Sequence, residues 1–253
     1  MSDNVTLRPP KSPNLQKFKD RASMIRKSLF DPRRKSKKEM EENGIWKPEP
    51  VFGNYLECLP LNESRGVPDF LCLCFERIET MISTEGTNPF TYHFELKKNL
   101  ALGIYRIPGD ATKMQKLRIE INNFDYEKLR TCDDVALLTS TLKMYFREMP
   151  QPLISTSFQS LGLQASLDDI RILMDQELTL LEKNLMRALF LHLQKVAADP
   201  KNMMNAHNIA MVFGPNLFHV SSEGRRPFSM QTEFESNNSL IETLIENASR
   251  LFG

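Results

Sequence analysis

The sequence has few of the residues from which metal and redox sites are built. Its 253 residues include four cysteines and four histidines, with no CxxC pair and no histidine at a metal-ligand spacing. Structural zinc sites need clusters of such ligands, so no metal site is predicted. All four cysteines are interpreted as reduced and mostly buried small apolar residues: Cys58, Cys72, Cys74 and Cys132.

The signatures of a self-sufficient enzyme are also missing. No GxxxxGKS or GxxxxGKT motif is present, so the chain cannot hold nucleotide phosphates in a P-loop of its own. The GxSxG, HExxH and kinase-type HRD motifs are absent as well. His192 lies within an apolar helical segment, where a packed or surface histidine is more typical than a catalytic base. The sequence therefore predicts a chain without a self-sufficient catalytic site.

Long apolar segments are lacking too. No apolar run approaches the roughly 18 residues that a membrane span needs. The first residues, "MSDNVTLRPPKSPN", lack the apolar core of a secretory signal. A cytoplasmic location is therefore expected.

Basic charge is concentrated near the start of the sequence. Residues 8–38 hold twelve Lys and Arg against two acidic residues, a net charge of +10. Asp3 removes one charge and the whole chain carries +1, so residues 39–253 carry −8. Such asymmetry indicates two parts with different roles. We predict a basic tail over residues 1–46 and an acidic body over residues 47–253.

Apolar residues in the tail recur with helical spacing. Phe18, Ala22, Ile25 and Leu29 follow one another at 0, +4, +7 and +11, so a helix there would have one apolar face and a basic remainder. One interpretation is a solvated, partly helical extension that could fold back on the body. Another is a helix that binds an acidic partner or, through residues 8–38, an anionic membrane surface. Nucleic acid is not expected as a partner, because no recognised nucleic-acid motif accompanies the charge.

The strong segments of the body have the 3.6-residue period of helices, and strand-like alternation is scarce. Proline, glycine, aspartate and asparagine mark where these helices begin and end. The expected boundaries are a start near Pro68, a start at Asp133 or Asp134 with a stop at Pro150, a stop before Pro200, a stop at Gly214 and Pro215, and a start at Asn237 or Asn238. The body is therefore predicted to be an all-α single helical bundle.

The stretch "GIYRIPG", Gly103–Gly109, places a single arginine between two glycines. Pro108 removes a backbone donor and disfavours helix in the residue before it, so Arg106 is expected on a short, stiff loop. Two further cations, Lys143 and Arg147, are spaced i, i+4 and share one helix face that points away from the apolar stripe. Taken alone, two such cations are most often a solvated surface.

Three motifs occur together in the order "GIYRIPG", "LLTSTLKMYFREMPQPLI" and "NIAMVFGPNLF". With "VFG" at residues 51–53 and "VPDFL" at residues 67–71, they resemble the GTPase-activating domain of the RhoGAP family over about residues 50–253. Each motif is short, but the combination is highly specific. The resemblance implies an all-helical bundle that activates a Rho-family small GTPase in its GTP form. It also implies that GTP and magnesium belong to that GTPase and that this chain needs no cofactor.

The resemblance assigns a role to each matching residue. Arg106 matches the arginine finger, which enters the partner's nucleotide site in trans and compensates transition-state charge. Lys143 resembles the lysine that faces the GTPase beside the finger, and Arg147 resembles the arginine that supports the finger loop through hydrogen bonds. Asn216, expected to be exposed where its helix ends, resembles the asparagine that contacts the GTPase switch region. Asn238 resembles another interface asparagine near the start of the last helix.

One segment departs from the family pattern. Residues 87–102 intervene between "TEG" at residues 84–86 and the finger loop, where the family usually proceeds directly. An insertion at this place could tilt the finger, extend the contact with the GTPase or mask the site. Two alternative functions stay open: a catalytically weak adaptor that only binds the GTPase, and a membrane-recruited scaffold that works through the basic tail.

Overall fold

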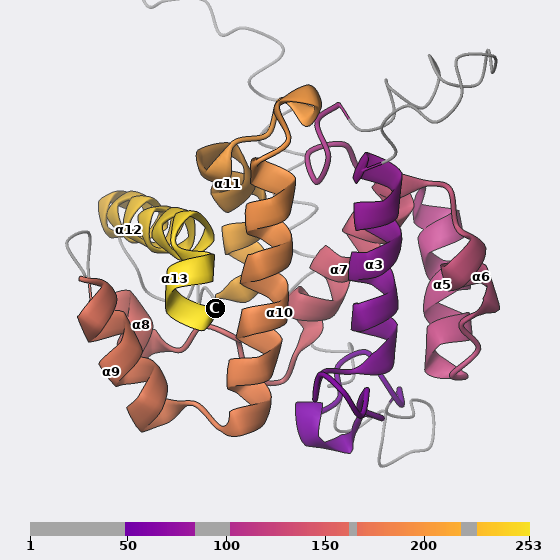
Figure 1. Cartoon of the computed structure of the whole chain (residues 1–253), viewed down its shortest axis with the longest axis horizontal. Helices are drawn as coiled ribbons and strands as arrows, with labels where there is room; N and C mark the ends of the chain where they lie inside the picture. The colour runs from indigo at the N-terminus through magenta and orange to yellow at the C-terminus, as the bar shows by residue number, and fades with distance from the viewer. Residues whose placement is uncertain (1–48, 84–101, 162–165, 219–226) are drawn as a thin grey trace, which may run out of the picture. The chain divides into compact units, whose positions relative to one another are not determined.

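The computed structural model describes residues 49–83, 102–161, 166–218 and 227–253 (Figure 1). The predicted tail over residues 1–46 and nearly all of the segment over residues 87–102 lie outside the described residues. Glu49–Gly253 form one compact unit.

Within the described residues the fold is all-α, as predicted, and the nearest approach to a sheet is one isolated β-bridge between Leu61 and Pro68. None of these helices combines the length and the apolar character needed to cross a membrane. The 3₁₀ helices are η1 (Leu56–Cys58) and η3 (Pro200–Asn202). The α-helices are α3 (Asp69–Ser83), α5 (Ala111–Asn122), α6 (Glu127–Thr131), α7 (Val135–Glu148), α8 (Thr156–Ser160), α9 (Leu167–Glu177), α10 (Leu180–Ala197), α11 (Ala206–Leu217), α12 (Pro227–Glu246) and α13 (Ala248–Phe252).

Four helices form a closed ring of packed neighbours at the centre of the bundle. Helix α3 packs on α7 and α10, and α11 packs on the same two helices, while α12 covers α11 and α10 (Figure 1). In the interior of the bundle, pairs of aromatic side chains connect these helices. Tyr145 of α7 meets Phe70 of α3 at 4.9 Å between ring centroids, and Phe146 of α7 meets Phe213 of α11 at 5.7 Å. The core is therefore continuous from α3 to α11.

Several helix boundaries confirm the sequence signals. Asp134 caps α7, and its carboxylate accepts a hydrogen bond from the backbone N–H of Leu137 at 3.0 Å. Pro68 directly precedes α3, and α7 ends before Pro150. Helix α10 ends before Pro200, where η3 begins. Each of these signals acts on backbone groups close to it in the sequence.

The predicted end of α11 is wrong, because the helix includes both Gly214 and Pro215. Pro215 lies in the last turn, where its missing N–H removes only one helical hydrogen bond. The side-chain amide of Asn216 donates to the carbonyl oxygens of Val212 at 3.0 Å and Phe213 at 3.2 Å, which satisfies carbonyls of the final turn. Asn216 is therefore folded onto its own helix and is only 8% exposed.

The predicted start of the last helix is also wrong. Helix α12 begins at Pro227, so Asn237 and Asn238 lie inside it and are 8% and 5% exposed. A Cβ atom at Gly214 would stand 2.7 Å from Oδ1 of Asn238. Glycine at this position thus lets α11 and α12 approach closely, which is why it occurs inside a helix.

Candidate functional site

Arg106 lies on an exposed loop, as predicted. The Arg106 loop, residues 102–110, leads into α5 and exposes Arg106 and Ile107. The carbonyl oxygen of Gly103 accepts hydrogen bonds from the N–H groups of Arg106 at 2.8 Å and Ile107 at 3.1 Å. Gly103 and Tyr105 have positive φ angles of 67° and 68°. Glycine adopts this conformation readily, but it costs a tyrosine about 1 kcal/mol or more, so other contacts must hold Tyr105.

Hydrogen bonds fix both ends of this loop. The N–H of Gly103 donates to the carbonyl oxygen of Asn202 in η3 at 2.9 Å, and the N–H of Gly109 donates to the hydroxyl of Ser140 in α7 at 2.8 Å. A Cβ atom at Gly109 would stand 2.8 Å from the carbonyl oxygen of Ala136, so the loop lies directly against the backbone of α7. The exposed arginine is therefore presented from a loop that is held at both ends.

Tyr105 anchors the middle of the loop. Its side chain is fully buried, and its hydroxyl lies 2.7 Å from Nε2 of His192 on α10. Nδ1 of His192 lies 2.8 Å from one carboxylate oxygen of Glu79 on α3, and Lys195 binds the other oxygen at 2.6 Å. The Glu79–His192–Tyr105 chain thus runs from α3 through α10 to the residue that precedes Arg106.

Burial and hydrogen bonding fix the charges in this chain. Burial lowers the pKa of His192, although the neighbouring Glu79 carboxylate acts in the opposite direction. Burial acts to raise the pKa of Glu79, but the hydrogen bonds from His192 and Lys195, with the charges of Lys195 and of His192 once it is protonated in acid, outweigh it and hold this pKa at about 2. Near neutral pH Glu79 is therefore ionised and His192 is uncharged. Nδ1–H of His192 then donates to Glu79, and Nε2 accepts from the hydroxyl of Tyr105.

Acid is expected to destabilise the folded chain in two steps. In the unfolded chain His192 has its ordinary pKa of 6.5, and in the folded chain its pKa is lower. Once the pH falls below 6.5, the unfolded chain therefore binds more protons than the folded chain. The free energy of unfolding therefore decreases there, and it decreases again between pH 4.5 and about 2, the ordinary and folded pKa values of Glu79. Urea unfolding on either side of the first step measures the effect. A His192→Gln variant should lose that step, and an equal pH slope in both proteins would contradict the assignment.

Lys143 and Arg147 share one face of α7, but their contacts differ from the predicted roles. Lys143 is half-buried, and its ammonium group donates a hydrogen bond to the carbonyl oxygen of Tyr105. Burial lowers the pKa of Lys143, and the charge of Arg147 adds to this effect. Arg147 is exposed and has no hydrogen bond or ion pair to any residue of the described ranges. The support that was predicted from Arg147 therefore comes from Lys143.

Asn238 lies at the seam between α11 and α12, whereas Asn216 lies in the last turn of α11, and its burial contradicts its predicted exposure. The amide of Asn238 donates to Sδ of Met211 at 3.2 Å, and its Oδ1 is buried with no partner among the residues that the structure describes. The amide of Asn216 donates to the carbonyl oxygen of Phe213, whose ring meets that of Tyr105 at 5.3 Å between centroids. Phe213 therefore connects the last turns of α11 with the Arg106 loop.

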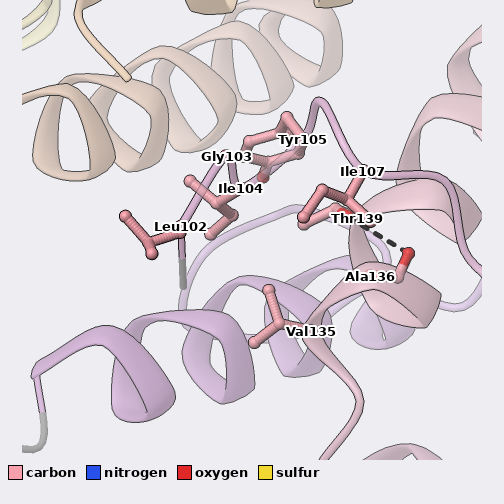
Figure 2. Close-up of a pocket in the computed structure, with 8 residues that line it drawn as sticks. All are labelled: Leu102, Gly103, Ile104, Tyr105, Ile107, Val135, Ala136 and Thr139. Atoms are coloured by element: carbon pink, nitrogen blue, oxygen red, sulfur yellow. Dashed lines mark hydrogen bonds between the residues drawn. The ribbon is translucent and has the colours of Figure 1, made fainter. Parts of the chain in front are cut away.

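A small pocket lies between the Arg106 loop and the start of α7 (Figure 2). It holds about 120 Å³ and is lined by Leu102, Gly103, Ile104, Tyr105, Ile107, Val135, Ala136 and Thr139. The hydroxyl of Thr139 donates to the carbonyl oxygen of Ala136 at 3.2 Å, within α7. No charged side chain lines this pocket, so its lining offers no ionised acid or base.

The described part of the chain holds no group of three or more His, Cys, Asp or Glu that could bind a metal ion. The four cysteines are free: Cys72 and Cys74 are buried, Cys132 is half-buried and Cys58 is exposed. That the partner supplies GTP and magnesium stays a prediction.

Three residues that hold the Arg106 loop were not predicted: Tyr105, His192 and Glu79. Their two hydrogen bonds join residues 87 and 113 positions apart in the sequence, so no local pattern connects them. The one available signal was the single histidine in the apolar segment of α10, because a buried imidazole needs polar partners.

A family model matches about half of this chain. The model is that of the RhoGAP domain, and it matches residues 92–222. The matched span includes the Arg106 loop, α7, α10 and α11 but leaves out α3 and α12. It begins inside the segment over residues 87–102, so most of that segment belongs to the matched span.

The chain is also similar to curated proteins and to solved structures. Rho GTPase-activating protein 15 of Gallus gallus is 30% identical over 88% of this chain, and WW domain-containing protein tag-325 of Caenorhabditis elegans is 33% identical over 71%. The chain spans only 45% and 20% of their respective lengths. The crystal structure of human Rho GTPase activating protein 15 covers 87% of this chain and 100% of its own, with 30% identity and a TM-score of 0.64. The BH domain from Graf covers 73% of this chain and 95% of its own, with 25% identity and a TM-score of 0.56.

Proposed function

This chain belongs to the RhoGAP domain family, and from that premise we propose that it accelerates GTP hydrolysis by a Rho-family small GTPase in its GTP form. Arg106 is the catalytic group, supplied in trans to the nucleotide on the partner. GTP and magnesium remain on the GTPase, and this chain breaks no bond itself. The chain is a GTPase activator rather than an enzyme with its own active site.

The observation that carries the proposal is the way Arg106 is held. Its side chain is exposed, whereas Tyr105 before it is fully buried and hydrogen-bonded at both its hydroxyl and its carbonyl oxygen. An arginine presented from a fixed turn loses less conformational entropy on docking than one on a free loop. Its planar, permanently charged guanidinium can contact two phosphate oxygens at once. Donors that are fixed before the reaction stabilise charge as it develops.

The neighbouring residues receive supporting roles. Lys143 holds the carbonyl oxygen of Tyr105 and so shapes the turn. Arg147, exposed one turn later on α7, contacts the GTPase. Asn238 lies at the α11–α12 seam, where Met211 is exposed, and Asn216 lies in the last turn of α11. Both shape the adjoining surface and do not project from it.

Single-turnover GTP hydrolysis by Rho-, Rac- and Cdc42-type GTPases tests the proposal. The full chain is expected to accelerate hydrolysis by at least one of them. Binding to the GTP form without acceleration would contradict the proposal and support the adaptor function instead. A chain that lacks residues 1–46 is the matched comparison for the tail. If the tail recruits the activator to a membrane, the two chains should stimulate hydrolysis equally in solution. On anionic vesicles that carry the GTPase, only the chain with residues 1–46 should then give the full stimulation.

Lys143→Met is expected to lower the maximal stimulated rate by roughly tenfold, with little change in affinity for the GTP form. Methionine keeps a long apolar side chain but leaves the carbonyl oxygen of Tyr105 without its charged donor, and such a bond is worth about 1.5–3 kcal/mol. Arg147→Met, four residues along α7, is the matched variant and should weaken affinity more than the maximal rate. A Lys143→Met protein with the full maximal rate would contradict the role given to Lys143.

A further inference from the structure

We propose that Glu79 and His192 are positioning residues for Arg106, which act on it through the buried hydroxyl of Tyr105. This inference rests on the proposed function and adds two side chains outside the sequence motifs of the family resemblance. Glu79 and His192 affect the rate through the geometry of the Arg106 loop and not through contact with the GTPase.

The three side chains of the Glu79–His192–Tyr105 chain are joined by two short hydrogen bonds, of 2.7 Å and 2.8 Å. Tyr105 and His192 are 0% and 2% exposed. At that depth a polar group that loses its partner is left unpaired, so each bond strongly favours the observed arrangement. Glu79 lies on α3 and His192 on α10, and these two helices pack against each other. The hydrogen bonds to Tyr105 are therefore made from side chains on rigid elements.

Tyr105 passes this restraint to Arg106 through the backbone. It directly precedes Arg106 and has a φ of 68°, a conformation that a tyrosine keeps only when its surroundings enforce it. His192 fixes the hydroxyl end of the side chain, and Lys143 fixes the carbonyl oxygen of the same residue. Because the side chain is held at its tip and the peptide at its carbonyl, a shift of the ring must also turn the peptide that leads into Arg106.

Packing alone does not account for this arrangement. A phenylalanine in place of Tyr105 would fill the same space, and Phe75 already packs on the ring of His192 at 4.7 Å between centroids. Instead, α10 brings an imidazole to the hydroxyl, and α3 brings a carboxylate to the other nitrogen of that imidazole. Glu79 selects the tautomer of His192 in which Nε2 accepts. The hydroxyl of Tyr105 therefore has one defined direction in which to donate.

Two variants of His192 separate its two hydrogen bonds. His192→Gln keeps an acceptor near the position of Nε2, for Tyr105, and gives up the bond to Glu79. His192→Asn keeps a donor near the position of Nδ1, for Glu79, and gives up the bond to Tyr105. The maximal rate of stimulated single-turnover hydrolysis is expected to fall roughly tenfold in His192→Asn and clearly less in His192→Gln, with unchanged affinity for the GTP form. An unchanged rate in His192→Asn, or an equal loss in both variants, would overturn the proposal.

Gln194→Ala is the matched control on the same helix. Gln194 donates to the carbonyl oxygen of Glu246 at 2.9 Å and accepts from the N–H of Ser249 at 3.2 Å, near α13. Its removal breaks hydrogen bonds of α10 without reaching the Arg106 loop, so it should lower thermal stability and leave the maximal rate unchanged. If Gln194→Ala lowers the maximal rate as much as His192→Asn does, the loss reflects stability alone and the proposal fails.

Measurements on the free full chain test the same inference without a GTPase. Nitrogen NMR of the imidazole should find His192 protonated at Nδ1. Protonation at Nε2 would overturn the proposed direction of the hydrogen bonds from Tyr105 through His192 to Glu79. Exchange of the backbone N–H of Arg106, which donates to Gly103 at 2.8 Å, should be faster in His192→Asn than in His192→Gln. Equal exchange in the two variants would contradict the restraint. These results stand even if the wild-type chain stimulates no GTPase, so failure of the proposed function and failure of the positioning role can be told apart.

Discussion

The Arg106→Ala variant is expected to lower the maximal rate of stimulated GTP hydrolysis by about 10³- to 10⁵-fold, the range attributed to arginine fingers. This loss corresponds to about 4–7 kcal/mol of activation free energy. Charge develops on the phosphate oxygens in the transition state, and alanine leaves it uncompensated. The side chain of Arg106 is exposed and makes no hydrogen bond within the described ranges, so its removal should leave the loop and the affinity for the GTP form largely intact.

Single-turnover hydrolysis at saturating activator measures this rate, and binding to the GTP-loaded partner measures affinity separately. Arg106→Lys keeps the charge but loses the planar, two-point contact, so its rate should be intermediate. Arg187→Ala removes an exposed arginine of α10 and should behave as the wild type. A wild-type rate in Arg106→Ala would show that another group supplies the charge.

The second large effect is expected from Gly109→Ala. This variant should lower the maximal rate by about 10²-fold and the free energy of unfolding by about 1–3 kcal/mol. A Cβ atom at this position would stand 2.8 Å from the carbonyl oxygen of Ala136 and 2.9 Å from Cα of Leu137. Both are backbone atoms of α7 and cannot rotate away, so the Arg106 loop must shift. A displacement of ~1 Å at a catalytic group is enough for such a loss of rate.

Gly103→Ala, in the same loop, is the matched comparison for this steric argument. A Cβ atom there meets nothing closer than the side chain of Ile107 at 3.6 Å, but the φ of 67° is unfavourable for alanine by about 1–2 kcal/mol. Urea unfolding should therefore report a similar loss of stability, while the maximal rate stays much closer to that of the wild type. Equal losses of rate in the two variants would rule out the clash with α7 as the cause.

The features that could be predicted from the sequence depend on residues close together in the chain. Asp134 caps α7 by accepting from Leu137, three residues later. Pro108 and the glycines around Arg106 exclude a helix there, and the structure confirms a loop. The helical period of the apolar residues does not depend on which partner each face meets, so the all-α fold was predictable without the packing.

Where the predictions failed, tertiary contacts overrode a local signal. Gly214 and Pro215 are helix breakers by local rules, yet α11 continues through both. Gly214 lets α12 approach, and the amide of Asn216 binds carbonyl oxygens of the last turn. The wrong helix end and the wrong exposure of Asn216 are therefore a single error, because an asparagine inside a packed helix is covered.

The contacts that hold the Arg106 loop depend on distances that a single sequence does not contain. Lys143 reaches the carbonyl oxygen of Tyr105 across 38 residues of sequence, and the bonds through His192 span 87 and 113 residues. The i, i+4 spacing correctly placed Lys143 and Arg147 on one face. It could not say which of the two meets the loop, since that depends on where the loop crosses α7.

The way α3 and α12 complete the bundle limits how the polypeptide can be shortened. The stretch that the family model matches, residues 92–222, contains neither helix. A fragment cut at those limits would lose the Phe70 ring that meets Tyr145 and the helix that lies against Gly214. Large apolar faces of the remaining helices would meet water, and surfaces of that size promote aggregation. The stretch that identifies this family in a sequence is smaller than the unit that can fold, so the ends of a working fragment should follow the packing and not the motifs.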